Sequence, residues 1–69
     1  MMYNLLAESA RKGITKKQMS ECIDVSEKTF YNKIRGYSEF TLIEAQMIRD
    51  TFFPEQKIEY LFKQIEDEN

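Results

Sequence analysis

Residues 15–36, TKKQMSECIDVSEKTFYNKIRG, hold two short segments in which apolar residues recur at helical spacing. This spacing predicts helices with one buried face. We expect them over Lys16–Ile23 and Glu27–Arg35, so that only Asp24–Ser26 connects them. Such a short connection forces two helices to cross steeply, which is the geometry of a helix-turn-helix. The side chains predicted to bury together at the crossing are Met19, Ile23, Val25, Phe30 and Ile34.

Three of the predicted helices begin after a residue whose side-chain oxygen can accept a hydrogen bond from an unpaired backbone N–H. These N-cap residues are Thr15, Ser26 and Thr41. Gln18 and Glu44 each stand three residues after one of the threonines, which completes two capping boxes. Gly13 and Gly36 are expected to end the first and third helices, because glycine adopts the left-handed conformation without strain.

The whole chain has helical spacing and no alternating segment, which predicts an all-α fold of five helices in a single domain over residues 1–69. The first helix is expected over Met2–Lys12, with Leu6 and Ala10 four residues apart on one side, and the fourth over Leu42–Phe52. The fifth is expected to begin at Pro54, since proline is favoured at the first helical position. Its inward-facing residues would be Ile58, Leu61 and Phe62, and residues 63–69 would form a frayed tail.

Composition excludes several classes of protein. Cys22 is the single cysteine and there is no histidine, so the chain can form neither an internal disulfide nor a Cys/His zinc site. No apolar run approaches the roughly 20 residues of a membrane span. The carboxylates are scattered, and no acid–base pair stands out. We therefore expect a cytoplasmic protein that is not an enzyme and that needs no metal, cofactor or small-molecule ligand, with Cys22 as a partly buried packing residue.

The formal net charge is −2, but the charges are unevenly distributed. Residues 11–37 contain seven basic and three acidic side chains, a balance of +4, while the remainder carries −6. A basic stretch confined to one segment is the electrostatic footprint that phosphate binding requires. The basic residues of this segment are Arg11, Lys12, Lys16, Lys17, Lys28, Lys33 and Arg35.

Residues 15–36 resemble the helix-turn-helix of the phage Cro and repressor family, also called the xenobiotic-response-element family. The similarity extends over about residues 3–62 and rests on Thr15, Ser26 and Gly36, together with a small residue at Ser20. The sequence differs from the family pattern at Lys16, Asp24 and Arg35, where Gln, Gly and Asn are usual. The resemblance implies a compact five-helix, lambda-repressor-like DNA-binding domain without a separate effector domain.

In this family the N-terminal part of the second motif helix lies in the major groove. The resemblance therefore implies base contacts from helix 27–35, through Glu27, Lys28, Tyr31 and Asn32. Lys can donate to guanine, Asn can pair with adenine and Glu can accept from cytosine. Contacts to the DNA phosphates would come from Lys16, Lys17, Thr29, Arg35 and Tyr37.

These features together predict a sequence-specific transcriptional regulator of bacterial or prophage type, such as a repressor, that binds double-stranded DNA as a homodimer. The expected dimer interface is formed by Ile58, Leu61 and Phe62. The alternative is a protein-interaction module, antirepressor-like or antitoxin-like, that uses the same helical face to bind a protein. The acidic C-terminal third of the chain keeps this alternative open.

Overall fold

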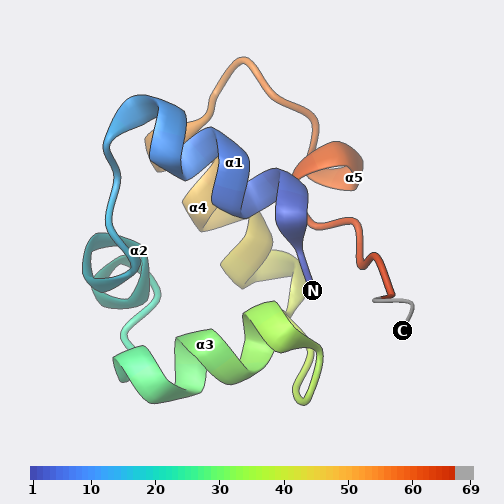
Figure 1. The fold of residues 1–69 in the computed structure, drawn as a ribbon. Coiled ribbons are helices and arrows are strands. Elements are labelled where there is room, and N and C mark those ends of the chain that lie inside the picture. The colour runs from blue at the N-terminus through green and yellow to red at the C-terminus, as the bar shows by residue number, and fades with distance from the viewer. Residues whose placement is uncertain (67–69) are drawn as a thin grey trace.

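The computed structural model describes residues 1–66, and within that range all regular structure is helical (Figure 1). The five predicted helices are present, which confirms the all-α fold class. None of these helices is long and apolar enough to cross a membrane. Their bounds are α1 Tyr3–Lys12, α2 Lys16–Cys22, α3 Glu27–Arg35, α4 Leu42–Phe52 and α5 Ile58–Leu61.

The capping residues define the starts of three helices, as the sequence predicts. The side-chain oxygens of Thr15, Ser26 and Thr41 each accept a backbone N–H from the residue three positions later, at 3.0 Å. Both capping boxes are complete, because the side chains of Gln18 and Glu44 accept the backbone N–H groups of the two threonines. Each device satisfies N–H groups that would otherwise lack a partner at the helix start.

The connection between α2 and α3 is a tight turn. The Asp24 N–H donates to the Glu21 carbonyl at 3.2 Å, and the Val25 N–H donates to the Ser20 carbonyl at 3.0 Å. Asp24 has a φ of +59°, in the left-handed region where glycine carries no strain. Ser20 is buried, and its small side chain donates back to the Lys17 carbonyl, so α3 can pack close to α2.

The hydrophobic core receives side chains from every one of the five helices. Phe30 and Ile34 are fully buried, as predicted. On α1, Leu5 is fully buried, whereas Leu6 is only partly buried and Ala10 is exposed. The other fully buried apolar side chains are Met19, Ile48, Phe53 and Leu61.

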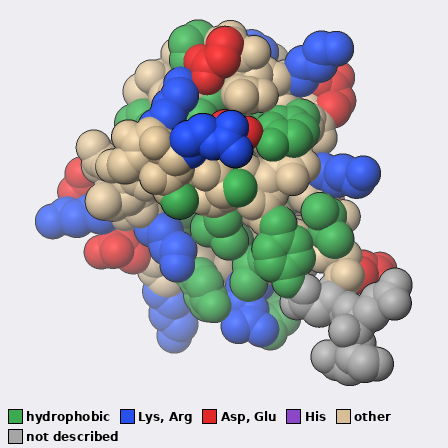
Figure 2. Space-filling model, turned by 45° about the horizontal axis from the view of Figure 1, so that its top comes forward, with side chains coloured by type: hydrophobic (Ala, Val, Ile, Leu, Met, Phe, Trp, Pro, Cys, Tyr) green, Lys and Arg blue, Asp and Glu red, His purple; other side chains and the backbone are tan. Residues whose placement is uncertain are grey.

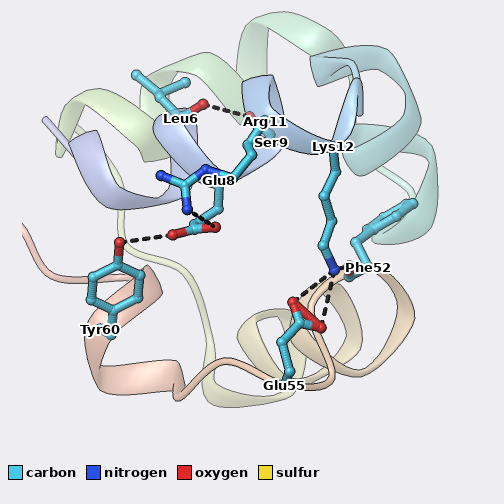
Figure 3. Close-up of polar contacts among 8 residues, drawn as sticks. All are labelled: Leu6, Glu8, Ser9, Arg11, Lys12, Phe52, Glu55 and Tyr60. Atoms are coloured by element: carbon cyan, nitrogen blue, oxygen red, sulfur yellow. Dashed lines mark hydrogen bonds and ion pairs between the residues drawn. The ribbon is translucent and has the colours of Figure 1, made fainter.

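The buried side of α1 carries a charged residue. Glu8 has 4% of its surface exposed, yet its carboxylate accepts a hydrogen bond from the Tyr60 hydroxyl at 2.9 Å and lies 3.8 Å from the Arg11 guanidinium (Figure 3). These partners compensate for the lost hydration of the carboxylate, so Leu5 and Glu8 can face the core together. The same hydrogen bond to Glu8 raises the pKa of Tyr60 above its ordinary value.

The start of the last helix differs from the prediction. Pro54 does not begin α5 but lies in a turn, which the Gln56 N–H closes onto the Phe53 carbonyl at 2.9 Å. Proline suits the second position of such a turn as well as the first position of a helix. Phe53 is fully buried at the end of α4, so the chain must turn there before it forms α5.

The C-terminal segment up to Ile65 is held against the N-terminus, in contrast to the predicted frayed tail. The Met1 ammonium donates to the Ile65 carbonyl at 2.9 Å, and the Ile65 N–H donates to the Met1 carbonyl at 3.1 Å. Figure 1 accordingly shows the first residues of the chain on the same side of the molecule as this segment. The part of the predicted tail at residues 67–69 lies outside the described residues.

Candidate nucleic-acid interface

One side of α3 faces away from the rest of the molecule. In Figure 1, α3 lies along the lower edge of the fold, with α1 and α4 above it. Phe30 and Ile34 point into the core. At about 100° per residue, the opposite side of the helix must then point outward. Lys28 and Arg35 are exposed on that side, and Asn32 is half-buried.

Ion pairs within the chain neutralise three of the seven cations in the basic segment. Arg11 contacts Glu8, the Lys12 ammonium lies 2.7 Å from a Glu55 oxygen, and the Lys33 ammonium lies 3.2 Å from a Glu44 oxygen. The other four cations have no carboxylate partner within residues 1–66, and all four belong to α2 or α3. They are Lys16, Lys17, Lys28 and Arg35.

Lys33 illustrates how the fold removes a cation from the surface. Its side chain is only 12% exposed, and its ammonium also donates to the Glu39 carbonyl at 3.0 Å. It lies 5.8 Å from the centre of the Phe40 ring. Lys33 therefore joins α3 to Glu44 at the start of α4 and to the segment between the two helices.

A row of alternating cations and aromatic rings crosses from α2 to the end of α3. The Lys16 ammonium lies 5.0 Å from the centre of the Tyr31 ring, and the Arg35 guanidinium lies 5.6 Å from the same centre. Arg35 also donates a 3.3 Å hydrogen bond to the Tyr31 hydroxyl and lies 5.2 Å from the Tyr37 ring centre. We call Lys16, Tyr31, Arg35 and Tyr37 the cation–aromatic row.

The cation–aromatic row places two positive charges against aromatic rings. Distances of this size allow attraction between a cation and the electron-rich face of a ring. The hydrogen bond to Tyr31, with a further contribution from Tyr37, raises the pKa of Arg35 above its ordinary value. The guanidinium therefore remains charged, and it is exposed.

The predicted base-contacting residues fall into two groups. The side chains of Glu27, Lys28 and Asn32 make no hydrogen bond or ion pair with any other side chain or backbone group in residues 1–66. Their polar atoms are therefore available to a partner. Tyr31 differs, because its ring and hydroxyl already contact Lys16 and Arg35.

The predicted phosphate-contacting residues are also not equivalent. The fold brings Lys16, Arg35 and Tyr37 into the cation–aromatic row. Lys17 is exposed beside them in the first turn of α2. Thr29 is instead part of the α3 cap, since its hydroxyl accepts a hydrogen bond from the Ser26 hydroxyl at 3.0 Å.

The structure conflicts with the predicted dimer interface at one of its three residues. Leu61 has no exposed surface and belongs to the core, because α5 packs against α1 and α4. Ile58 and Phe62 are only partly buried. The large apolar residues left exposed on α4 are Leu42, Ile43 and Met47, which the sequence interpretation missed. The sequence could have indicated this exposure at residues 42 and 43. Adjacent residues lie about 100° apart around a helix, so these two apolar side chains cannot both face inward.

Hydrophobic side chains are concentrated in the lower half of the face shown in Figure 2, with charged side chains of both signs around them.

No three His, Cys, Asp or Glu residues within positions 1–66 are placed so that they could hold a metal ion.

The chain was compared with protein-family models, curated proteins and solved structures, and it matches none of them. A function must therefore be inferred from the geometry and chemistry of the molecule itself.

Proposed function

We propose that this protein is a sequence-specific DNA-binding regulator of bacterial or prophage type, in which α2 and α3 act as a helix-turn-helix. The observation that carries the proposal is the location of the four cations of residues 11–37 that have no carboxylate partner within residues 1–66. All of them lie on α2 and α3, although the chain as a whole is acidic. A surface of this kind attracts the phosphates of DNA regardless of net charge. Such a regulator would act in the cytoplasm.

Base recognition is assigned to the outer side of α3. Lys28 can donate to the O6 and N7 acceptors of guanine, Asn32 can form two hydrogen bonds with adenine, and Glu27 can accept from the N4 amine of cytosine. These side chains have no competing polar partner within residues 1–66. They would determine which sequence is bound.

Phosphate binding is assigned to Lys17 and the cation–aromatic row. Contacts from these residues would position α3 in the groove without selecting a sequence. Within the row we give Tyr31 a positioning role in place of a base contact, because its ring and hydroxyl hold Lys16 and Arg35. Tyr37 would contact the backbone at the exposed end of the row.

Selection of bound fragments from random DNA, followed by sequencing, tests the proposal. A short shared motif is the expected result. Asn32→Ala should cost about 1–3 kcal/mol and relax the preference at one base pair, whereas Lys17→Ala should weaken binding to every sequence alike. Both variants should keep wild-type helicity by circular dichroism, because neither side chain contributes to the core.

Two results would contradict this assignment. If Asn32→Ala selects the same motif as the wild type, α3 does not dock as proposed. If the folded protein retains no DNA even at low ionic strength, the DNA-binding function fails. The same α3 surface would then fit the alternative of a protein-interaction module, antirepressor-like or antitoxin-like.

A further inference from the structure

A hollow of about 610 Å³ lies where the segment after α3, the start of α4 and α5 meet. Its volume is within the range of sites that bind small molecules, about 300–1,000 Å³. Most of the residues that line it are apolar. They are Met2, Phe40, Leu42, Ala45, Ile58 and Phe62. We call this surface the α4–α5 hollow.

Two aromatic rings form part of the wall of the α4–α5 hollow. Phe40 and Phe62 lie edge to face, with ring centres 5.0 Å apart and an angle of 72° between the ring planes. Phe40 packs in the same way against the fully buried Phe30, at 5.6 Å, so the pair is continuous with the core. Leu42, by contrast, is 67% exposed. The lining therefore extends from the core to an exposed apolar edge.

The charge of the α4–α5 hollow is negative. Glu39 is the single ionisable side chain among the described residues that line it. Glu39 has no ion-pair partner within residues 1–66. Lys33 lies near the Phe40 ring, but Glu44 already neutralises its charge. The hollow therefore attracts a cation and repels an anion.

Neutral acceptors are present beside this carboxylate. The side chains of Ser38 and Gln64 line the hollow and make no hydrogen bond within residues 1–66. The Gln64 amide packs against Gly36, where a Cβ atom would lie only 3.2 Å from it. A hydroxyl oxygen and an amide oxygen can each accept a hydrogen bond, and an ammonium group carries three N–H donors. The polar part of the lining thus matches the chemistry of an ammonium group.

A second hollow, of about 420 Å³, provides a contrast. It shares Leu42 and Ile58 with the α4–α5 hollow. Its other lining residues are Arg49, Lys57 and Glu59, which are two cations and one carboxylate. The second hollow therefore has no preference for a cation.

We propose that the α4–α5 hollow binds a small organic cation with a flat apolar body, such as an aryl-alkyl ammonium compound. The apolar body lies against Phe40, Phe62 and Leu42, and the charged group lies toward Glu39. This assignment departs from the sequence-based expectation that the protein needs no small-molecule ligand. It does not depend on the proposed DNA-binding function.

Titration of the full chain with naphthylmethylammonium, without DNA, tests the proposal. The backbone amide NMR signals of Gly36, Ser38 and Leu42 should shift, with a dissociation constant of about 0.1–2 mM for a ligand of roughly a dozen non-hydrogen atoms. Naphthylacetate has the same ring system but carries a negative charge. It should bind about 3- to 10-fold more weakly, because an exposed carboxylate repels it.

Two pairs of variants separate the charge from the apolar wall. Glu39→Gln should remove most of the preference for the cation, whereas Glu59→Gln, which changes the net charge equally at the second hollow, should keep it. Leu42→Ser should weaken the binding of both probes by about 3- to 10-fold, since an apolar contact is lost. Ile43→Ser should leave both unchanged, because Ile43 is 69% exposed on the same helix turn but lines neither hollow.

Equal binding of the two probes to the wild type would overturn the proposal, as would loss of the preference in Glu59→Gln but not in Glu39→Gln. The absence of any shift at the three amides would have the same consequence. Shifts at these amides that follow protein concentration without a probe would show that a second copy of the chain occupies the hollow instead. None of these results bears on the proposed function, which fails only if the folded protein retains no DNA.

Discussion

Tyr31 shows how one side chain can serve a surface without contacting the ligand itself. Lys16 reaches its ring from α2, and Arg35 reaches the same ring from one turn further along α3. Each contact between a cation and an exposed ring contributes about 0.5–1 kcal/mol, which offsets part of the roughly 1.5–2 kcal/mol of entropy lost when one long side chain is held in place. Tyr31 therefore favours one arrangement of the two cations before any phosphate arrives.

Replacement of Tyr31 should affect affinity and leave sequence preference unchanged. Tyr31→Leu should weaken binding to selected and random DNA alike by about 3- to 10-fold, because two cation–ring contacts are lost. Tyr31→Phe keeps the ring and loses only the hydroxyl contact with Arg35, so it should recover most of the affinity. Fluorescence anisotropy with both kinds of DNA measures the effect. A Tyr31→Leu variant that prefers a different base pair would show that Tyr31 contacts a base.

At the scale of the elements, the turn between α2 and α3 carries local strain. Asp24 adopts a φ of +59°, which costs a residue with a side chain roughly 1 kcal/mol relative to glycine. The adjoining backbone hydrogen bonds, to the Ser20 and Glu21 carbonyls, require this conformation. The strain is local to the turn, because Asp24 is exposed and packs against nothing in the core.

Asp24→Gly should therefore stabilise the protein by about 0.5–1 kcal/mol, and Asp24→Ala should destabilise it by a similar amount. Urea unfolding followed by circular dichroism measures both free energies. Glycine is more flexible than aspartate in the unfolded chain, which limits the gain. Loss of stability in Asp24→Gly would mean that the Asp24 side chain itself supports the turn.

The start of α4 depends on an ionised carboxylate. The Thr41 backbone N–H donates to Glu44, and the Lys33 ammonium contacts the same carboxylate, so the pKa of Glu44 lies below its ordinary value of 4.5. Because the folded state lowers this pKa, the stabilisation is fully present above the unfolded pKa and is lost as pH falls through the folded pKa. The relevant window therefore lies below pH 4.5.

Glu44→Gln should remove the contribution of the negative charge to stability and keep that of the cap, since glutamine can still complete a capping box. The difference in unfolding free energy between wild type and variant should be largest near neutral pH and should shrink as pH falls below 4.5. Glu55→Gln is the control, because Glu55 pairs with Lys12 at a site where half of its side chain is exposed. Its effect should be smaller, since solvent screens exposed pairs. A Glu44→Gln difference that does not change with pH would contradict the role of the ionised form.

At the scale of the whole molecule, the fold sorts the cations by position. In the basic segment Arg11, Lys12 and Lys33 are neutralised by carboxylates, whereas the other four cations, all on α2 or α3, have no carboxylate partner within residues 1–66. An acidic protein thereby keeps four unpaired cations on two neighbouring helices. Under the proposed function, DNA binding at this surface would release counterions, so the affinity would depend on salt.

The logarithm of the binding constant should fall with the logarithm of salt concentration with a slope of about −4 to −5, if a dimer neutralises about four to six phosphates. Anisotropy titrations at several salt concentrations measure the slope. Lys17→Ala should make it less steep, by about one for each lost contact. Lys12→Ala should leave it unchanged, because Lys12 is already paired with Glu55. A flat salt response would contradict phosphate binding.

The sequence by itself determined the helices and most of their boundaries. Thr15, Ser26 and Thr41 cap helices through groups no more than three residues away, and Gly36 ends α3 in a left-handed conformation. The buried residues of α3 followed from spacing alone, because local interactions fix both the start and the end of this helix. Interactions of this range depend on few residues and can be predicted without knowledge of the fold.

The tertiary structure alone decided which residues face the core and which charges stay available. Leu5 and Glu8 share the buried side of α1, where the Glu8 carboxylate is satisfied by Tyr60, a residue 52 positions away. Leu61 is buried although spacing also allowed it to face a partner. Lys33 is withdrawn from the surface by Glu44, while Lys16 and Arg35 share Tyr31. The burial and the charge of a residue depend on partners brought together only by the packing of distant helices, which local spacing does not encode.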